Sequence, residues 1–286
     1  MRLAHYLVLV AAIALIAILY WRGNTIPPAK KDGGATPAAP MAGGMPSTPM
    51  HEPASFDSLL AAARTGLPAH AVSEIDVVEK QIAATGDSAA MSPHFTDLAK
   101  LWQQHKHLPI AAFYYATAAK LDNSEKKLNF AGQLFLDLIH DAGDPGVQVW
   151  EAQQSISCLE RSLEINPKND TVRLAMASAY IEGTGQLMQG VQVLREITRE
   201  KPDDIPANLM LGKLSVQSGQ FDKAIKRFET VLKQEPENKE ALYFLAESYK
   251  GMGDKQKAIE LFEKCKKVVN DPAFSKDIDQ YITSFK

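Results

Sequence analysis

The sequence lacks most of the features that mark enzymes and metalloproteins. Its 286 residues include two cysteines, Cys158 and Cys265, which are too few for a disulfide framework and have no metal-ligand spacing. It has no glycine-rich phosphate loop after a strand and no nucleophile elbow. His105 and His107 are two residues apart and therefore point to different sides of a helix. These absences predict that the chain is not an enzyme and carries no cofactor.

An excess of positive charge is also missing. The 31 lysines and arginines are balanced by 34 acidic residues, which gives a formal net charge of −3. The sequence therefore has no basic field of the kind that recruits nucleic acid. After Phe56 there is no stretch of strand-like alternation, and the apolar residues recur at helical spacing instead. We expect an all-α protein without a nucleic-acid partner.

Formal charge is absent from residues 3–21, which read LAHYLVLVAAIALIAILYW. As a helix this run spans roughly 28 Å, close to the thickness of the hydrocarbon core of a bilayer. Tyr20 and Trp21 end the run with rings that suit the headgroup boundary. Because no small-residue cleavage site adjoins it, residues 1–23 are predicted to anchor the chain in the lipid bilayer without being cleaved. The basic residues on the two flanks nearly balance and leave the orientation open.

Residues 24–54 contain seven prolines and two Gly-Gly pairs. Such a segment cannot bury a core, so it is predicted to be a flexible linker. Thioether and imidazole groups bind Cu(I), and the linker contains four of them: Met41, Met45, Met50 and His51. These four residues are the candidate metal site of an alternative, copper-handling function, although linkers of this composition commonly bind nothing.

Similar phrases recur at a fixed period in the rest of the chain. Pro167, Pro202 and Pro236 lie 35 and 34 residues apart, and they close the phrases LERSLEINPKN, REITREKPDD and ETVLKQEPEN. Each phrase ends a pair of amphipathic helical patterns. A small residue, such as Ala224 or Ala258, occupies the position where the second helix crosses the first. The proline stops the second helix and sets the turn into the next unit.

This pattern resembles the tetratricopeptide repeat (TPR), a helix pair of about 34 residues. The second unit departs from it in an inter-helix segment, HDAGDPGVQVW, that is about eight residues longer and is expected to be a loop. The third unit has one extra residue, which we place in its turn, GTGQLMQG. Residues 55–91 and 271–286 are expected to be capping helices. Five units match in tandem between them, over residues 92–270: 92–124, 125–169, 170–204, 205–238 and 239–270.

The resemblance implies a right-handed α-solenoid whose first helices line a concave groove for a protein or peptide. An apolar run in such a groove marks a contact site, unless the chain's own N-terminal helices fill it. A carboxylate clamp for chaperones is not expected, because Thr96, Lys100 and Phe130 occupy matching positions. The groove positions of the family correspond to Leu136, Asp137, Leu174, Ser178, Ile181, Leu209, Lys213, Val216, Tyr243, Glu247 and Lys250.

The whole chain, with its short anchor, proline-rich linker and repeat array, resembles the anchored TPR proteins of Gram-negative bacterial envelopes. That resemblance implies a single-pass protein of the inner membrane with its repeats in the periplasm. It also implies a scaffold for the assembly of an envelope complex. The alternative is a copper-handling or cytochrome c maturation accessory factor that uses the Met/His linker.

Overall fold

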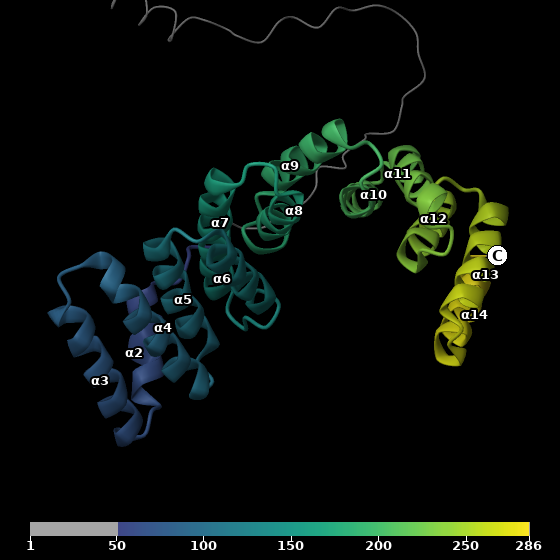
Figure 1. The fold of residues 1–286 in the computed structure, drawn as a ribbon. Coiled ribbons are helices and arrows are strands. Elements are labelled where there is room, and N and C mark those ends of the chain that lie inside the picture. Colours follow the sequence, from purple (N-terminus) through teal and green to yellow (C-terminus); the bar gives the residue numbers. More distant parts are fainter. Residues whose placement is uncertain (1–50, 286) are drawn as a thin grey trace, which may run out of the picture. The chain divides into compact units, whose positions relative to one another are not determined.

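The computed structural model describes residues 51–285. These residues form helices joined by short turns, and no strand occurs among them (Figure 1). The expected anchor, residues 1–23, and the linker residues Met41, Met45 and Met50 lie outside the described residues. No helix in the described part is long and apolar enough to cross a bilayer. For residues 51–285 the expectation of an all-helical fold is confirmed.

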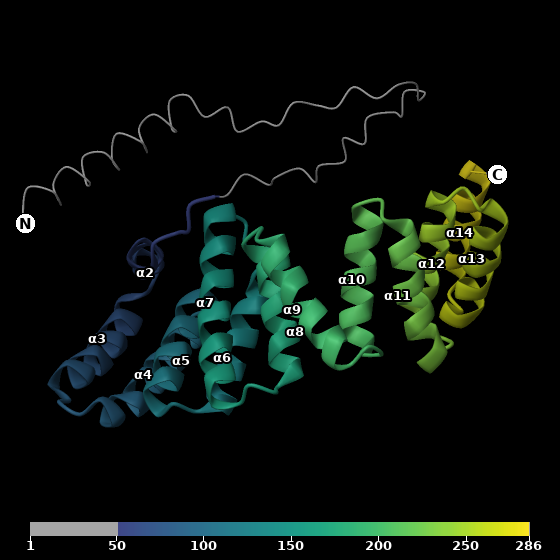
Figure 2. The same cartoon turned by 90° about the horizontal axis from the view of Figure 1, so that it is seen from above.

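Two helices precede the repeated pairs, α2 (Phe56–Thr65) and α3 (Ala69–Ala84), and α14 (Pro272–Phe285) follows them. Within each pair the two helices lie side by side (Figure 2). The pairs are α4 (Ser88–Gln104) with α5 (Leu108–Asp122), α6 (Glu125–Leu138) with α7 (Pro145–Ile165), α8 (Asp170–Ser178) and η1 (Ala179–Gly183) with α9 (Leu187–Glu200), α10 (Ile205–Gln217) with α11 (Phe221–Gln234), and α12 (Lys239–Gly251) with α13 (Lys255–Val269).

The core of this part of the chain is a row of clusters between neighbouring helices. A single helix pair cannot cover its own apolar face, so neighbouring pairs cover it together. Each pair supplies at least one large side chain that is fully buried. These side chains are Trp102, Phe135, Leu194, Phe228 and Phe262, all 0% exposed.

Close approach of the two helices in a pair depends on small residues. A Cβ atom added at Gly212 on α10 would lie 2.6 Å from the ring of Phe228 on α11. Ala224 and Ala258 are completely buried. These residues explain the small side chains that recur in the sequence pattern, because a larger one would hold the helices apart.

The second helices of the pairs end in two different ways. Before Pro167, Pro202 and Pro236 the last residue leaves the helical conformation, with φ between −133° and −122° and ψ between 79° and 86°, because a following proline disfavours the α region. Where the proline is missing, an asparagine ends the helix in the left-handed conformation, with φ of 47° at Asn123 and 51° at Asn270. Asparagine tolerates this conformation better than other residues with a side chain.

The loop expected in the second unit is confirmed for residues 140–144 and is wrong for residues 145–150, which are helical. Only residues 139–144 separate α6 from α7, and α7 runs for 21 residues where α9 and α11 have 14. Pro145 suits the first helical position, because its missing N–H has no partner there. The Asp144 carboxylate accepts from the amides of Gly146 at 2.7 Å and Val147 at 3.1 Å. Most of the extra residues therefore lengthen the helix, and the rest lengthen the connection, which has six residues where α10 and α11 are joined by three.

The extra residue of the third unit lies in its first helix and not in its turn. Residues 170–183 are helical, one residue more than the 13 of α10, and the turn to α9 has the same length as the turn to α11. The helix absorbs the insertion as a π-helical segment, η1, which ends with a bond from the amide of Thr184 to the carbonyl of Ala179. Most π-helical segments are single turns of this kind inside an α-helix.

The end helices pack onto the pairs beside them. Phe56 of α2 stacks on Phe113 of α5, with ring centroids 3.7 Å apart, and lies 6.1 Å from the ring of Trp150 on α7. At the other end, Ile278 and Ile282 of α14 are buried in the cluster that contains Phe262.

Candidate functional site

The residues expected to line the groove share one register on three of the first helices. On α8, α10 and α12 they occupy positions i and i+4, which lie on one face of an α-helix. At i+7, Val216 and Lys250 continue that face on α10 and α12, whereas Ile181 lies in the π-helical segment η1. We call these nine residues, together with Leu136 and Asp137 of α6, the first-helix stripe. The nine are Leu174, Ser178 and Ile181, then Leu209, Lys213 and Val216, then Tyr243, Glu247 and Lys250.

The apolar members of the first-helix stripe are half-buried. Leu174 and Ile181 pack at the margin of the cluster around Leu194, and Leu209 and Val216 pack at the margin of the cluster around Phe228. Each therefore presents only part of its surface to solvent.

Asp137, Lys213, Glu247 and Lys250 supply the charges of the first-helix stripe. Asp137 accepts from the side-chain amide of Gln133 at 2.7 Å. Lys213 forms an ion pair of 2.7 Å with Glu240 in the first turn of α12. Lys250 lies 3.7 Å from Glu247.

The chain's own C-terminal helix covers the last part of the stripe. The ammonium of Lys250 lies 4.1 Å from the ring centroid of Tyr281 on α14 and bonds its hydroxyl. Burial and the neighbouring Glu247 carboxylate raise the pKa of Tyr281 to about 12. The N-terminal helices do not join the clusters that hold the stripe residues of α8, α10 and α12; α2 and α3 pack with α4, α5 and α7.

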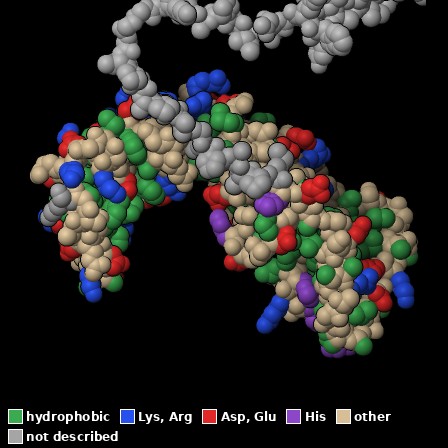
Figure 3. All heavy atoms as spheres, turned by 180° about the vertical axis from the view of Figure 1, so that it is seen from behind, with side chains coloured by type: hydrophobic (Ala, Val, Ile, Leu, Met, Phe, Trp, Pro, Cys, Tyr) green, Lys and Arg blue, Asp and Glu red, His purple; other side chains and the backbone are tan. Residues whose placement is uncertain are grey.

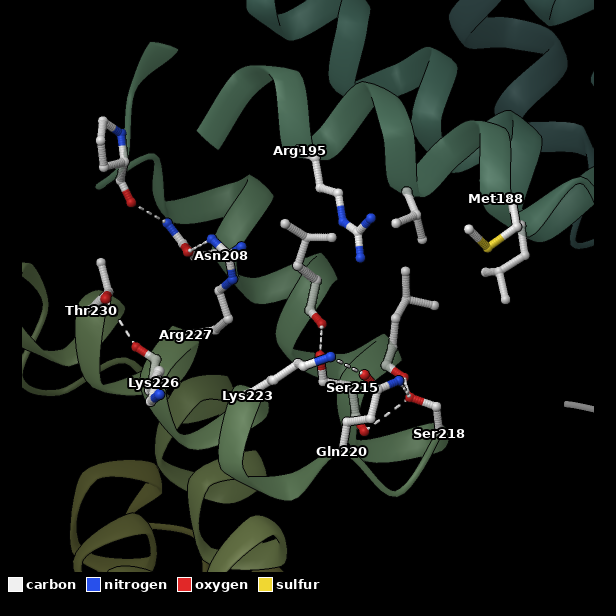
Figure 4. Close-up of a pocket in the computed structure, with 15 residues that line it drawn as sticks. Met188, Arg195, Asn208, Ser215, Ser218, Gln220, Lys223, Lys226, Arg227 and Thr230 are labelled. Atoms are coloured by element: carbon white, nitrogen blue, oxygen red, sulfur yellow. Dashed lines mark hydrogen bonds between the residues drawn. The ribbon is translucent and has the colours of Figure 1, made fainter. Parts of the chain in front are cut away.

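A hollow that the sequence did not reveal lies between α9 and α11 over the side of α10 (Figure 4). We call it the basic groove. It has a volume of about 550 Å³, and apolar side chains from α9 and α10 form part of its wall. None of the stripe residues lines it. Its lining residues are Leu187, Met188, Val191, Arg195, Pro202, Asn208, Leu211, Leu214, Ser215, Ser218, Gln220, Lys223, Lys226, Arg227 and Thr230.

The ionisable side chains of the basic groove are all cationic. Four basic residues line it, namely Arg195, Lys223, Lys226 and Arg227, and no aspartate or glutamate does. On the face seen in Figure 3, by contrast, side chains of both signs are interspersed. Burial, followed by the nearby charge of Arg195, lowers the pKa of Arg227. The sequence did not reveal the groove because its residues come from three helices and each one reads as part of a solvated helix face.

Hydrogen bonds hold two of the four cations in place. Arg227 donates to the side-chain oxygen of Asn208 at 2.9 Å, and Asn208 in turn donates to the backbone carbonyls of Pro202 and Asp204. Lys223 donates to the side-chain oxygen of Gln220 at 2.6 Å. Figure 4 shows Arg195 reaching from α9 into the space between the helices.

The described residues contain no group of three histidine, cysteine or acidic side chains that could hold a metal ion. His51 is the one member of the Met/His group that the structure describes, and it is exposed. Cys158 and Cys265 are buried and unpaired. Burial raises the pKa of the Cys158 thiol to about 11, which makes it a poor nucleophile.

Tandem helix pairs, in which small residues let the two helices approach closely, define a helical-repeat protein. The model of the tetratricopeptide repeat matches residues 215–275, which contain the end of α10, α11 to α13 and the start of α14. Residues 215–275 of this chain therefore carry tetratricopeptide repeats.

The chain is similar to one large curated protein over a short segment. It is 34% identical over 86 residues to anaphase-promoting complex subunit 3 of Dictyostelium discoideum; this segment is 30% of the present chain and spans 9% of that protein. Solved structures are also similar, among them the following three. YrrB, described as a TPR protein with an unusual peptide-binding site, has 18% identity and a TM-score of 0.47, with 65% of this chain and 91% of that chain covered. MamA of Desulfovibrio magneticus has 18% identity and a TM-score of 0.49, with 65% and 97% covered. A tetratricopeptide repeat protein of Parabacteroides merdae has 17% identity and a TM-score of 0.48, with 80% and 88% covered.

Proposed function

We propose that this protein is a scaffold that binds partner proteins through the first-helix stripe. The shared register of the stripe carries the proposal. Three successive first helices carry an aliphatic or aromatic residue at i and a polar or charged residue at i+4, and the first two add a half-buried aliphatic residue at i+7. A partner segment laid across them would find apolar contacts from Leu174, Ile181 and Leu209, with polar groups beside them.

The scaffold is proposed to be tethered to the inner membrane with its repeats in the periplasm, where it assists assembly of an envelope complex. The uncharged run at residues 3–21 supports the tether, since its length matches the hydrocarbon core of a bilayer. Residues 24–54 would then separate the repeats from the membrane. A flexible linker of this kind places a bound partner at an effective concentration in the millimolar range near its membrane targets.

The test begins with crosslinking in native membranes. An alkaline wash and co-purification of the full-length chain follow. The wild type is expected to stay with the membrane and to carry partner proteins. The double variant Leu209→Ser and Val216→Ser removes the apolar part of the stripe on α10 and should lose those partners. Lys213→Glu, a change at a partly exposed side chain, should weaken the same capture.

The matched control is Val77→Ser with Met252→Ser, two apolar side chains that are 54% and 57% exposed and lie outside the stripe. The control should keep every partner, and circular dichroism should show equal helicity in all variants. Partner capture that survives both stripe variants would overturn the stripe as the binding surface. Release of the wild type by the alkaline wash would overturn the tether.

A further inference from the structure

We propose that the basic groove between α9 and α11 is a second binding site, and that its ligand is an acidic peptide segment with one aliphatic anchor residue. The site is separate from the first-helix stripe, because the two share no residue. Partners on the stripe and in the basic groove can therefore be tested independently.

Unpaired positive charge is the first observation that carries this proposal. Within the described residues, Arg195, Lys223, Lys226 and Arg227 form no ion pair with any carboxylate. Nearby cations behave differently: Arg173 pairs with Asp170 at 3.1 Å and with Glu200 at 2.9 Å. Like charges gathered around one hollow repel each other, and a bound carboxylate relieves that repulsion.

The positions of these cations are prepared for a ligand. Arg227 is half-buried and held through Asn208 by two backbone carbonyls, and Lys223 is held by Gln220. Side chains that are already ordered lose less conformational entropy when they bind. Arginine also matches the planar carboxylate with two parallel hydrogen bonds. Arg195 and Lys226 have no side-chain partner in the part of the chain that the structure describes, which leaves their donors free for an anion.

The basic groove has an apolar edge, which favours a peptide over a small anion as its ligand. Met188 on α9 lines the groove and is 69% exposed, the largest exposed fraction among the big hydrophobic side chains of residues 51–285. Leu187, Val191 and Leu214 lie in the same wall and are half-buried. Methionine adapts its shape to a guest side chain. A ligand that satisfies the cations and also covers this edge needs both carboxylates and an aliphatic group.

Other occupants fit less well. The chain's own linker has Lys30 and Lys31 but a single acidic residue, Asp32, between residues 24 and 50, so it does not complement a cationic site. A nucleic-acid duplex needs an extended basic surface, whereas this hollow is about 550 Å³ in a chain with a net charge of −3. Charge complementarity together with the apolar edge therefore favours an acidic peptide.

The test uses the full-length chain and fluorescence anisotropy of a fluorescein-labelled peptide, EEELEEE. Two matched probes replace its glutamates by glutamine (QQQLQQQ) or its leucine by glycine (EEEGEEE). We expect EEELEEE to bind, its affinity to fall as salt is raised, and both matched probes to bind more weakly. The double variant Arg195→Glu and Lys226→Glu should weaken binding of EEELEEE by about tenfold or more. The methyl resonance of Met188 should shift on binding.

The control is Lys233→Glu with Lys264→Glu, which changes the net charge by the same amount at two exposed lysines outside the groove. It should leave affinity within about twofold, and so should Leu209→Ser with Val216→Ser, because those residues belong to the stripe. The proposal is overturned if QQQLQQQ binds as well as EEELEEE, or if the control weakens binding as much as the groove variant. Dimerisation of the chain that disappears in the groove variant would also overturn it, by assigning the groove to a second copy.

Discussion

Glu151 on α7 is a carboxylic acid in an environment that does not suit a charge. Its side chain is 1% exposed, and one of its two oxygens has no hydrogen-bond partner within the described residues. Burial, with a smaller contribution from the charge of Asp141, raises its pKa from an ordinary value of 4.5 to about 7. Between about pH 4.5 and pH 7, the folded state therefore holds a proton on Glu151 that the unfolded chain releases.

The pH dependence of stability follows from that difference. The contribution of Glu151 is fully present below about pH 4.5 and is lost as the pH rises through 7, because only the folded state must then hold a buried charge. Glu151→Gln removes the ionisation. We expect this variant to match the wild type at pH 5 and to exceed its free energy of unfolding by about 1–3 kcal/mol at pH 8.

Urea unfolding at the two pH values measures this effect. The control is Glu74→Gln on α3, an exposed glutamate with no hydrogen-bond or ion-pair partner in the described part of the chain. It should give the same difference from the wild type at both pH values. If Glu151→Gln shows no gain between pH 5 and pH 8, the carboxylate is ionised or hydrated in the folded protein and its burial is less complete than the structure indicates.

Single residues differ in how far the sequence predicts their role. Gly212, Ala224 and Ala258 recur at fixed positions in the repeat, so their role at the helix crossings could be predicted from spacing alone. Arg195 and Arg227 belong to different helix pairs and have no fixed spacing, so only the packing of α9 and of α11 against α10 brings them to the same groove. The burial of Glu151 was also hidden, because a glutamate in an amphipathic pattern reads as a solvated residue.

Helix ends show the same contrast at the scale of the element. The ends of α7, α9 and α11 could be predicted from their prolines, and Asn123 and Asn270 end the second helix in the two units that lack this proline. The start of α7 could not. The phrase DPG reads equally well as a turn or as an N-cap followed by a proline at the first helical position. The π-helical segment η1 was missed because an added residue leaves no mark in the sequence that tells a helix insertion from a turn insertion.

Loss of the N-cap of α7 is expected to lower the stability of the protein measurably. The Asp144 carboxylate accepts from two backbone amides of the first turn, which otherwise have no partner. Asp144→Ala should therefore lower the free energy of unfolding by about 1 kcal/mol. Hydrogen exchange should show faster exchange of the amides of residues 146–150, which belong to the extra turns of this helix.

Ser124→Ala is the control for the cap. Ser124 also precedes a helix, α6, but its side chain makes no capping hydrogen bond. Replacing it should change stability by only a few tenths of a kcal/mol. Equal effects of the two substitutions would show that the hydrogen bonds of Asp144 contribute nothing and that the long form of α7 has another cause.

A row of local clusters has consequences for the molecule as a whole. In an array of repeats each unit is stabilised mainly by its neighbours, so loss of an end unit is felt most by the next one. The helix α14 has this position, since Ile278 and Ile282 cover Phe262 and Ala246 of the last pair. The two cysteines report on the array at different distances from that end.

Removal of residues 271–286 should therefore expose Cys265 and leave Cys158 protected. Cys265 on α13 is 1% exposed, Cys158 on α7 is 0% exposed, and burial raises the pKa of both thiols. In the intact chain neither should react rapidly with a disulfide reagent. Without α14 the last pair loses its cover and opens more often, so the reaction of Cys265 should accelerate by about tenfold or more.

The variants Cys158→Ala and Cys265→Ala assign each rate to one thiol. Equal acceleration at both cysteines would mean that the array unfolds as one cooperative unit, whereas no acceleration at Cys265 would show that the last pair is stable without α14.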